Sequence, residues 1–435
     1  MTLVSRRASM LGAALALVGS HAPALGRKPH GGVLRLRLPW PLDALDPHAI
    51  DDAAAALFGP AVADPLYALD AIGHPYPALA AGLPEGVKGG LRVQIRPNLL
   101  SARGLALDVR DVLWSLARAE RAGAAGLIAP LGKPKADSSD SNAILLAGAD
   151  PNAAAVLLSS PLTAILPRSF SAAKPDGTGA FVANLGRDTL TLTRNPSAAR
   201  GASFLDRVEV RVASDLKDPL RAFEASETDA SRLGEFLHEP RPGAIKFDAG
   251  PLGWVVLRTG KDAGAWGANG VAQKLLDGLP RGRLAHLGLS EASGGLGGDP
   301  AWGGEAAEIL VLEGATHLEQ IGKELAAILS RPGHELRVAM RPKHELTYRR
   351  DQGRFALMLE LVRSVGSAPN ATQLGLLTAV SPALAKKPPA ATGAKPREIA
   401  TTLPLGVVGQ LRATGAHAGN LHDFGSWDLG STWKR

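Results

Sequence analysis

Apolar and polar residues alternate with a period of two in several segments of the chain. Residues 33–38 alternate leucine with arginine, residues 189–193 alternate threonine with leucine, and residues 208–212 alternate valine with charged residues. Strict alternation places one kind of side chain on each face of an extended strand. These segments are therefore predicted to be half-buried β-strands. Residues 91–96 show the same alternation, and a further strand is expected there.

A helical spacing replaces this alternation in residues 109–117. Apolar side chains fall there at i, i+3, i+4, i+7 and i+8, which gives one apolar face on a helix. Asp108 stands where an N-cap residue would accept hydrogen bonds from the first turn. The pattern therefore predicts an amphipathic helix that begins just after Asp108.

A second helix is expected between two apolar strands near the C-terminal third. Thr316 and Glu319 have the spacing of a capping box, and apolar residues follow them at helical intervals. Residues 309–312 and 336–340 on either side read as strands. A strand, a helix and a strand within about thirty residues are typical of a parallel βαβ unit. The chain is therefore expected to have an α/β fold.

Length and composition limit the possible classes of protein. A chain of 435 residues is long enough for two or three domains. It contains 45% hydrophobic and 20% charged residues, which is typical of a globular protein. The net charge of +7 is scattered along the chain, so no nucleic-acid partner is expected. The absence of cysteine excludes disulfides, thiolate metal sites and cysteine nucleophiles.

The first residues have the features of an export signal. The pair Arg6-Arg7 precedes an apolar run over residues 10–18, and residues 22–24 (Ala-Pro-Ala) are small enough for cleavage. The paired arginines suit the twin-arginine route, while Ser9 leaves the general secretory route open. We expect residues 1–24 to be a cleaved signal peptide and the protein to be periplasmic. Without cysteine, no lipid anchor is expected.

Several short motifs resemble one known family. Residues 177–181 (Gly-Thr-Gly-Ala-Phe) and 194–196 (Arg-Asn-Pro) are similar to the Gly-Thr-Gly-Pro-Tyr and Arg-Asn-Pro segments of the peptide/nickel family, family 5, of extracytoplasmic solute-binding proteins. Residues 45–47 (Leu-Asp-Pro), 64–67 (Asp-Pro-Leu-Tyr) and 77–80 (Pro-Ala-Leu-Ala) resemble further family motifs in the same order. The matches within the predicted helix are Asp111, Val112, Ser115 and Arg118.

The resemblance implies a specific architecture. Proteins of this family have a two-lobed periplasmic-binding-protein fold of type II, in the large peptide-binding class, with discontinuous lobes and a cleft between them. By this resemblance, the core of lobe I would contain residues 25–60, 177–250 and 405–435. Residues 61–176 would form an extension subdomain of lobe I, and residues 251–404 would form lobe II.

The resemblance also implies a function. Such receptors capture a solute, close by hinge motion and deliver it to the permease subunits of an ABC importer. The expected solute is peptide-like or another small molecule, which includes a metal chelate or haem. We expect a monomer with no resident cofactor and no catalytic activity.

Aromatic residues make up only 4% of the chain, so their positions are informative for a binding cleft. Trp40 follows the first predicted strand, and Trp254 lies where the resemblance places the crossing between lobes. Packing in a core is the competing explanation for each aromatic residue. The candidate ligand contacts are Trp40, Tyr67, Trp254, Arg258, Thr259 and Trp427.

Other kinds of site stay open at this point. Ser171 and Lys174 have the Ser-x-x-Lys spacing of penicillin-recognising enzymes, which makes a periplasmic serine hydrolase the alternative function, although the order of the neighbouring motifs differs. His417 and His422 are weak candidates for a metal or haem site. A degenerate receptor with a sensing or structural role is a third alternative.

Overall fold

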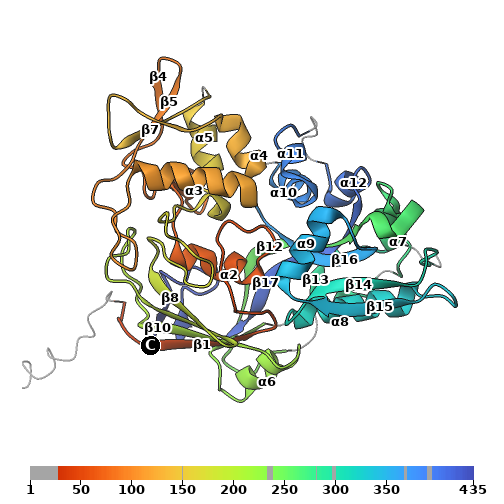
Figure 1. Ribbon diagram of the computed structural model, residues 1–435. Helices are drawn as coiled ribbons and strands as arrows, with labels where there is room; N and C mark the ends of the chain where they lie inside the picture. The colour runs from red at the N-terminus through yellow and green to blue at the C-terminus, as the bar shows by residue number, and fades with distance from the viewer. Residues whose placement is uncertain are drawn as a thin grey trace, which may run out of the picture.

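The computed structural model describes residues 28–148, 150–232, 239–280, 282–295, 300–366, 370–388 and 394–435 (Figure 1). The predicted signal peptide, residues 1–24, lies outside these ranges. Within them, no helix is both long enough and apolar enough to cross a membrane.

Three of the strands predicted from alternation form a small sheet together with β8. Its order is β1 (Val33–Leu38), β10 (Arg207–Val212), β9 (Thr189–Arg194) and β8 (Phe181–Gly186). β1 and β10 are parallel, although they lie far apart in the sequence. Every second residue in the central part of these strands is buried, so the predicted strands and their half-buried character are confirmed.

A seven-stranded sheet forms the centre of the molecule. Its strands in order are β11 (Ala230–Arg232), β17 (Leu405–His417), β12 (Ile245–Thr259), β16 (Leu357–Arg363), β14 (Ala307–Leu312) and β15 (Leu336–Arg341), with β13 (Leu289–Ser290) beside β17. Helix α8 (Thr316–Leu329) connects the parallel strands β14 and β15, which confirms the predicted βαβ unit. The predicted capping box is wrong, because Ala315 takes the N-cap position and has no side chain that accepts a hydrogen bond.

Two long strands of this sheet, β12 and β17, connect the lobes. They are antiparallel and pair from Arg258 with Leu405 to Ile245 with His417. One end of the pair lies beside β16, while the other end lies beside β11, which contacts β1 of the small sheet. The register shifts near Pro251, where the boundary between the lobes is predicted. The exact lobe bounds remain a prediction.

The predicted extension subdomain contains a second small sheet and a helix, drawn in orange and yellow in Figure 1. Helix α3 (Val109–Ala122) begins at a capping box. The Asp108 side chain accepts a hydrogen bond from the backbone N–H of Asp111, and the Asp111 side chain accepts one from the backbone N–H of Asp108. The predicted N-cap role of Asp108 is thus confirmed. The strands here are β2 (Tyr67–Leu69) paired with β3 (Pro75–Pro77), and the sheet β4 (Glu85–Val87), β5 (Gly90–Gln94), β7 (Ala143–Leu146) and β6 (Lys135–Ala136).

The remaining elements are short and cover the sheets. The α-helices are α2 (Ala53–Val62), α4 (Ala125–Ile128), α5 (Pro151–Leu157), α6 (Asp218–Glu224), α7 (Val271–Asp277), α9 (Lys343–Gln352), α10 (Ala371–Val380), α11 (Pro382–Ala385) and α12 (Pro396–Ala400). The 3-10 helices are η2 (Ala129–Leu131), η3 (Pro161–Thr163), η4 (Lys261–Gly267) and η5 (Ala285–Leu287), and the last strands are β18 (Leu421–His422) and β19 (Trp433–Lys434).

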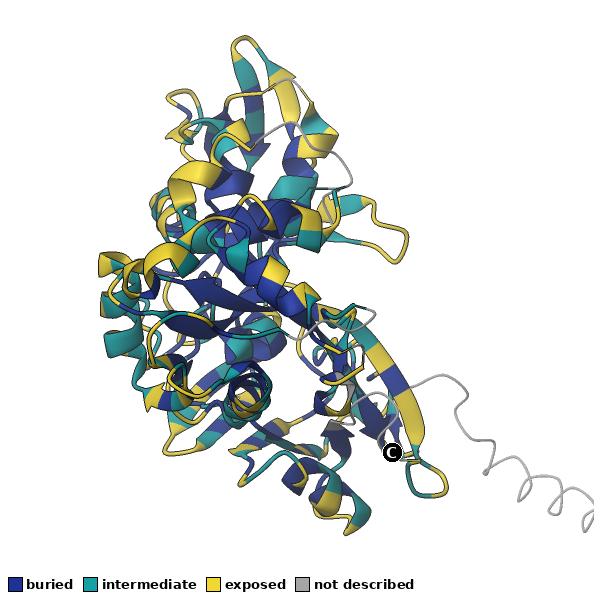
Figure 2. Cartoon of the chain, turned by 90° about the vertical axis from the view of Figure 1, so that its right-hand side faces the viewer, coloured by how far each residue is buried: buried dark blue, intermediate teal, exposed yellow. Residues whose placement is uncertain are grey.

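Two large hydrophobic clusters draw their residues from both lobes. The first joins Leu36 of β1 with Ile309 of β14, and the second joins Leu116 of α3 with Leu374 of α10. The strands in the middle of the molecule are accordingly dark blue in Figure 2, while the outer faces of many helices are exposed. Burial of apolar surface therefore holds the two lobes against each other as well as holding each lobe together.

The Gly-Thr-Gly segment packs against the end of α2. The Thr178 hydroxyl donates to the Asp64 carboxylate at 2.9 Å, and the Asn195 side-chain amide donates to the Gly179 carbonyl at 2.8 Å. The two family-like motifs, Gly-Thr-Gly and Arg-Asn-Pro, therefore contact each other. Gly179 does not have a left-handed φ, but a Cβ there would lie 2.5 Å from the Ala61 carbonyl oxygen. Glycine is needed for close approach of two backbones rather than for a turn.

The variant Gly179→Ala is expected to destabilise the protein by about 1–3 kcal/mol, because the new methyl group has to displace the backbone of α2. Gly86→Ala is the matched control, since a Cβ on Gly86 meets nothing within 4 Å. Its free energy of unfolding should stay within about 0.5 kcal/mol of the wild type. Chemical denaturation measures both, and equal stabilities of the two variants would contradict the close-approach explanation.

Candidate functional site

A chamber of about 370 Å³ lies between the lobes. The loop after β1, the start of α2 and the turn between β8 and β9 form its lobe I side. The loop after β14, the start of α9 and parts of β16 and β17 form the opposite side. Its lining combines apolar side chains with charged groups from both sides. A recess of this size, composition and position is typical of a site for a small molecule.

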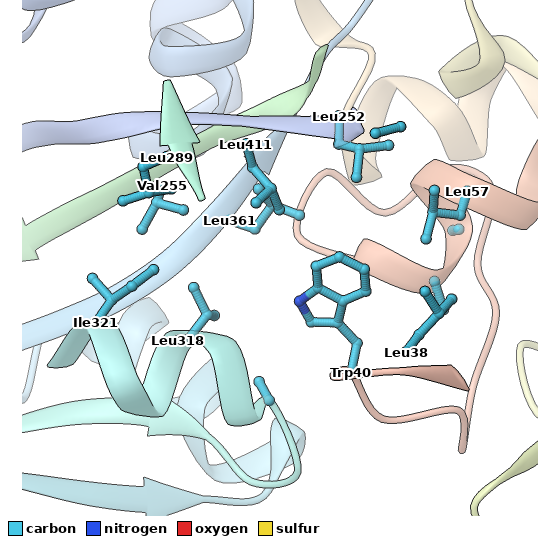
Figure 3. Packing of buried hydrophobic residues seen from close by; sticks show 14 of the residues in the cluster. Leu38, Trp40, Leu57, Leu252, Val255, Leu289, Leu318, Ile321, Leu361 and Leu411 are labelled. Carbon is cyan, nitrogen blue, oxygen red and sulfur yellow. The ribbon is translucent and has the colours of Figure 1, made fainter. Parts of the chain in front are cut away.

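Trp40 lies at the centre of the interface between the lobes (Figure 3). Residues 39–41 read Pro-Trp-Pro, and the prolines restrict the backbone of the loop that carries the indole. Leu57 approaches the indole from lobe I, and Leu318 and Leu361 approach it from lobe II. Only 3% of Trp40 is exposed. The indole is therefore wedged between the two walls of the chamber.

An ion-pair network connects the walls. Asp51 of lobe I accepts a hydrogen bond from Arg350 of α9 at 2.8 Å, and the Lys343 ammonium lies 3.9 Å from Asp51. Arg350 also lies 3.4 Å from Glu360 of β16, which accepts hydrogen bonds from Arg258. Burial acts to raise the pKa of Asp51, but the charges of Arg350 and Lys343 outweigh it and lower that pKa. Asp51 is therefore charged at neutral pH and links α9 to lobe I.

A second contact between the lobes is made by Arg363 at the end of β16. Its guanidinium donates to the carbonyls of Pro47, Ala49 and Ala55 at 3.0, 2.7 and 3.2 Å, and its backbone N–H donates to Ile50 at 2.8 Å. Burial lowers the pKa of Arg363 to about 10, so the group stays charged at neutral pH. These bonds fix the segment that leads into α2 and carries Asp51.

The Leu-Asp-Pro-His motif and the predicted helix contact each other in the structure. Arg118 of α3 donates to both carboxylate oxygens of Asp46, at 2.8 and 2.7 Å, and to Nδ1 of His48 at 2.9 Å. Because arginine can only donate, Nδ1 is an acceptor and the His48 Nε2–H donates to the Ala164 carbonyl at 2.7 Å. Burial lowers the pKa of His48 to about 4. The imidazole is therefore neutral and has a structural role.

A larger pocket of about 580 Å³ lies beside α2 and the C-terminal segment. Trp427 forms part of its wall, donates from its indole N–H to the Leu57 carbonyl at 3.0 Å, and packs against Phe247 and Phe424. A recess of about 20 Å³, the size of a water molecule, lies between Trp427 and Trp40. Two of the three candidate tryptophans, Trp40 and Trp427, are thus brought together.

The other four candidate residues lie in packed or hydrogen-bonded positions away from the chamber. Tyr67 is fully buried in the predicted extension subdomain, with its hydroxyl donating to a backbone carbonyl at 3.2 Å. Trp254 is 8% exposed and belongs to the cluster that contains α3 and α10. Arg258 pairs with Glu360, and the Thr259 hydroxyl donates to the backbone before β17 at 3.2 Å. Their role in ligand contact stays a prediction.

The residues considered for a metal site, His417 and His422, and those considered for a serine hydrolase, Ser171 and Lys174, have ordinary structural surroundings. His417 packs on Phe424 and His422 stacks on a tryptophan at 3.9 Å between ring centroids. In the part of the chain that the structure describes, no three His, Asp or Glu side chains are arranged to hold a metal. Ser171 and Lys174 are exposed and close a short turn through a backbone hydrogen bond of 3.0 Å. No base is held against the serine hydroxyl there.

Sequence reasoning missed the charged residues of the chamber. Asp51 and Arg350 are far apart in sequence, and nothing in their local patterns indicates that they pair. Helix α9 has no buried residues and therefore has no apolar periodicity to reveal it. The one available signal is the pair of acids, Asp51 and Asp52, directly before the apolar residues of α2.

The contribution of His48 to the free energy of unfolding is expected to decrease as the pH is lowered from about 6 to 4. Its folded pKa of about 4 lies below its ordinary value of 6.5, so the unfolded chain binds a proton in this window while the folded chain does not. A single such group changes the free energy of unfolding by about 1.4 kcal/mol per pH unit.

The variant His48→Gln removes this titration and should show a flatter pH dependence over the same window. Asp46 and Asp51 act at lower pH, because the arginine beside each of them lowers its folded pKa below the ordinary value of an aspartate. Urea denaturation at several pH values measures the difference. Parallel curves for the wild type and the variant would mean that His48 is not held in the neutral form.

Comparisons with known proteins agree with this architecture. No family model matches the chain, and no curated protein matches it at the level of sequence. Solved structures do match. The pheromone receptor PrgZ, described with its mode of peptide binding, superposes with a TM-score of 0.71 at 14% identity over 94% of this chain and 100% of its own.

Two further structures give similar values. The periplasmic binding protein DppA from Helicobacter pylori, in complex with the peptide STSA, has a TM-score of 0.68 at 14% identity, over 93% of this chain and 98% of its own. NikA from Staphylococcus aureus, in complex with Ni(L-His)2, has a TM-score of 0.67 at 13% identity, over 92% and 100%. Over the 92–94% of its length that these matches cover, the chain has the two-lobed α/β fold of the solute-binding proteins that its sequence motifs resemble.

Proposed function

We propose that the protein is a solute-binding receptor that captures a small solute between its lobes and delivers it to an ABC importer. The observation that carries this proposal is the chamber of about 370 Å³ at the interface of two lobes that are joined by β12 and β17. Two long strands between two lobes form a connection about which the lobes can rotate. The structures with the same fold are described as binding proteins or receptors.

The dimensions of the chamber favour a small solute. Pockets for small molecules have volumes of about 300–1,000 Å³, and this chamber lies near the lower end of that range. Its apolar lining and the edge of Trp40 would contact the non-polar part of the solute, while the charged side chains would orient it. We propose Trp40 as the main ligand contact and Trp427 as a contact in the adjoining pocket.

Solute binding would be coupled to closure by the contacts between the lobes. Asp51 contacts Arg350 only when α9 lies against lobe I, so this ion pair favours the closed arrangement. A solute that touches both walls stabilises the same arrangement, because it binds the closed form better than the open form. We propose that the permease recognises the closed form, outside the cytoplasmic membrane.

A hydrolytic function receives no support from the geometry. Ser171 and Lys174 are exposed in a turn and line none of the pockets described above. A serine nucleophile needs a base within hydrogen-bonding distance and a pocket that excludes water. The receptor is therefore the only function that we propose.

The proposal is tested by thermal unfolding of the purified protein against a panel of amino acids, short peptides, amines, metal chelates and haem. A true ligand at about 100 times its Kd should stabilise the protein by about 2.7 kcal/mol. It should also change the tryptophan fluorescence, because Trp40 lies at the chamber.

The variant Trp40→Phe should weaken binding of that ligand about tenfold, because it removes part of the aromatic surface. Trp266→Phe is the matched control, since Trp266 packs on Trp302 and lines none of the pockets described. Stabilisation that is the same in both variants would place the ligand elsewhere. Stabilisation by no compound would argue against a receptor.

A further inference from the structure

The chamber between the lobes is acidic, although the whole chain is basic. Among the described residues, five carboxylates and one cation, Lys343, line it. The chain as a whole carries a formal net charge of +7. The charge of the chamber is thus opposite in sign to the charge of the protein, and a concave surface concentrates the field of the charges that line it.

Three of the five carboxylates already have partners. Asp51 is paired with Arg350, and Asp52 accepts hydrogen bonds from the backbone of Asp46 and of the first turn of α2 at 3.0 and 2.9 Å. Asp188 lies 3.9 Å from its neighbour Arg187. These groups therefore already have partners in this structure and contribute mainly through their charge.

Asp43 and Glu313 differ from these three carboxylates because their side chains have no partner in the described part of the chain. Both are exposed, and neither side chain has an ion pair or hydrogen bond within the described part of the chain. Asp43 belongs to the loop after β1 in lobe I, and Glu313 belongs to the loop after β14 in lobe II. Each wall of the chamber thus presents one carboxylate that is free to bind a solute.

The two loops that carry these carboxylates meet across the interface. Gly314 has a φ of +78°, and a Cβ at this position would lie 3.3 Å from the side chain of Pro41. The loops that carry Asp43 and Glu313 therefore lie on either side of the interface, and both carboxylates add negative charge to the chamber. A positively charged solute in the chamber would be attracted to carboxylates of both lobes.

We propose that the solute is a small organic cation that carries an amine or guanidinium group. Asp43 and Glu313 bind its charged group from opposite lobes, and Trp40 and the leucines of the chamber contact its carbon chain. The indole can also attract a cation through its electron-rich face. This inference rests on the proposed receptor function and specifies the chemical class of its solute.

The test uses pairs of compounds that have the same size and differ in charge. 1,4-Diaminobutane is compared with 1,4-butanediol, and agmatine with its neutral carbamoyl analogue, by calorimetric titration and thermal unfolding of the full chain. Each cation should bind at least about tenfold more tightly than its neutral partner. Added salt should weaken the cations more than the neutral compounds, because it screens the attraction.

The variants Asp43→Asn and Glu313→Gln should each weaken cation binding about fivefold and leave neutral solutes unaffected. Both side chains are exposed and unpaired in the described structure, so the stability of the free protein should not change. Glu85→Gln, in the exposed hairpin of the extension subdomain, is the matched control and should bind the cations as the wild type does.

The outcomes separate this inference from the receptor function. If neutral or anionic solutes bind as tightly as the cations in a manner that requires Trp40, the receptor function holds and the inference is wrong. Cation binding that is unchanged in Asp43→Asn and Glu313→Gln would also overturn it. If no compound of any charge changes the unfolding temperature or the fluorescence, the receptor function itself fails.

Discussion

The arrangement of the site depends on the buried guanidinium of Arg363. It extends from the end of β16 and donates to three carbonyls in the segment between Pro47 and Ala55. A backbone held by three charge-assisted hydrogen bonds has little freedom, and a buried arginine without such acceptors would be costly. The same segment carries His48, which is tied to α3, and Asp51, which is tied to α9. Arg363 therefore positions one wall of the chamber relative to the other.

The interface between the lobes combines attractive contacts with unpaired negative charges. Shared hydrophobic clusters and the Asp51–Arg350 pair hold the lobes together, whereas Asp43 and Glu313 add negative charge to both sides of the chamber. A ligand shifts an equilibrium between two states of a protein only by its differential affinity for them. The unpaired carboxylates are where a ligand can supply that difference.

Local patterns in the sequence predicted much of the fold and little of the site. Alternation predicted three of the four strands of the small sheet, and helical spacing predicted α3, because these elements have one buried face. Motifs that resemble the family contact one another in the structure, as Arg118 does when it donates to Asp46. β16 is buried along its whole length and α9 has no fully buried residue, so neither has a periodic pattern. Pairs such as Asp51 and Arg350 depend on tertiary structure and leave no local signal.

The most direct measurement is a crystal structure of the protein with the compound that stabilises it most. We expect density for that compound in the chamber between the lobes, against Trp40, with its charged group between Asp43 and Glu313. The Arg363 bonds to the segment before α2 should be intact in the same structure. Density confined to the pocket beside Trp427, or to a site outside both pockets, would contradict the central claim that the chamber between the lobes binds the solute.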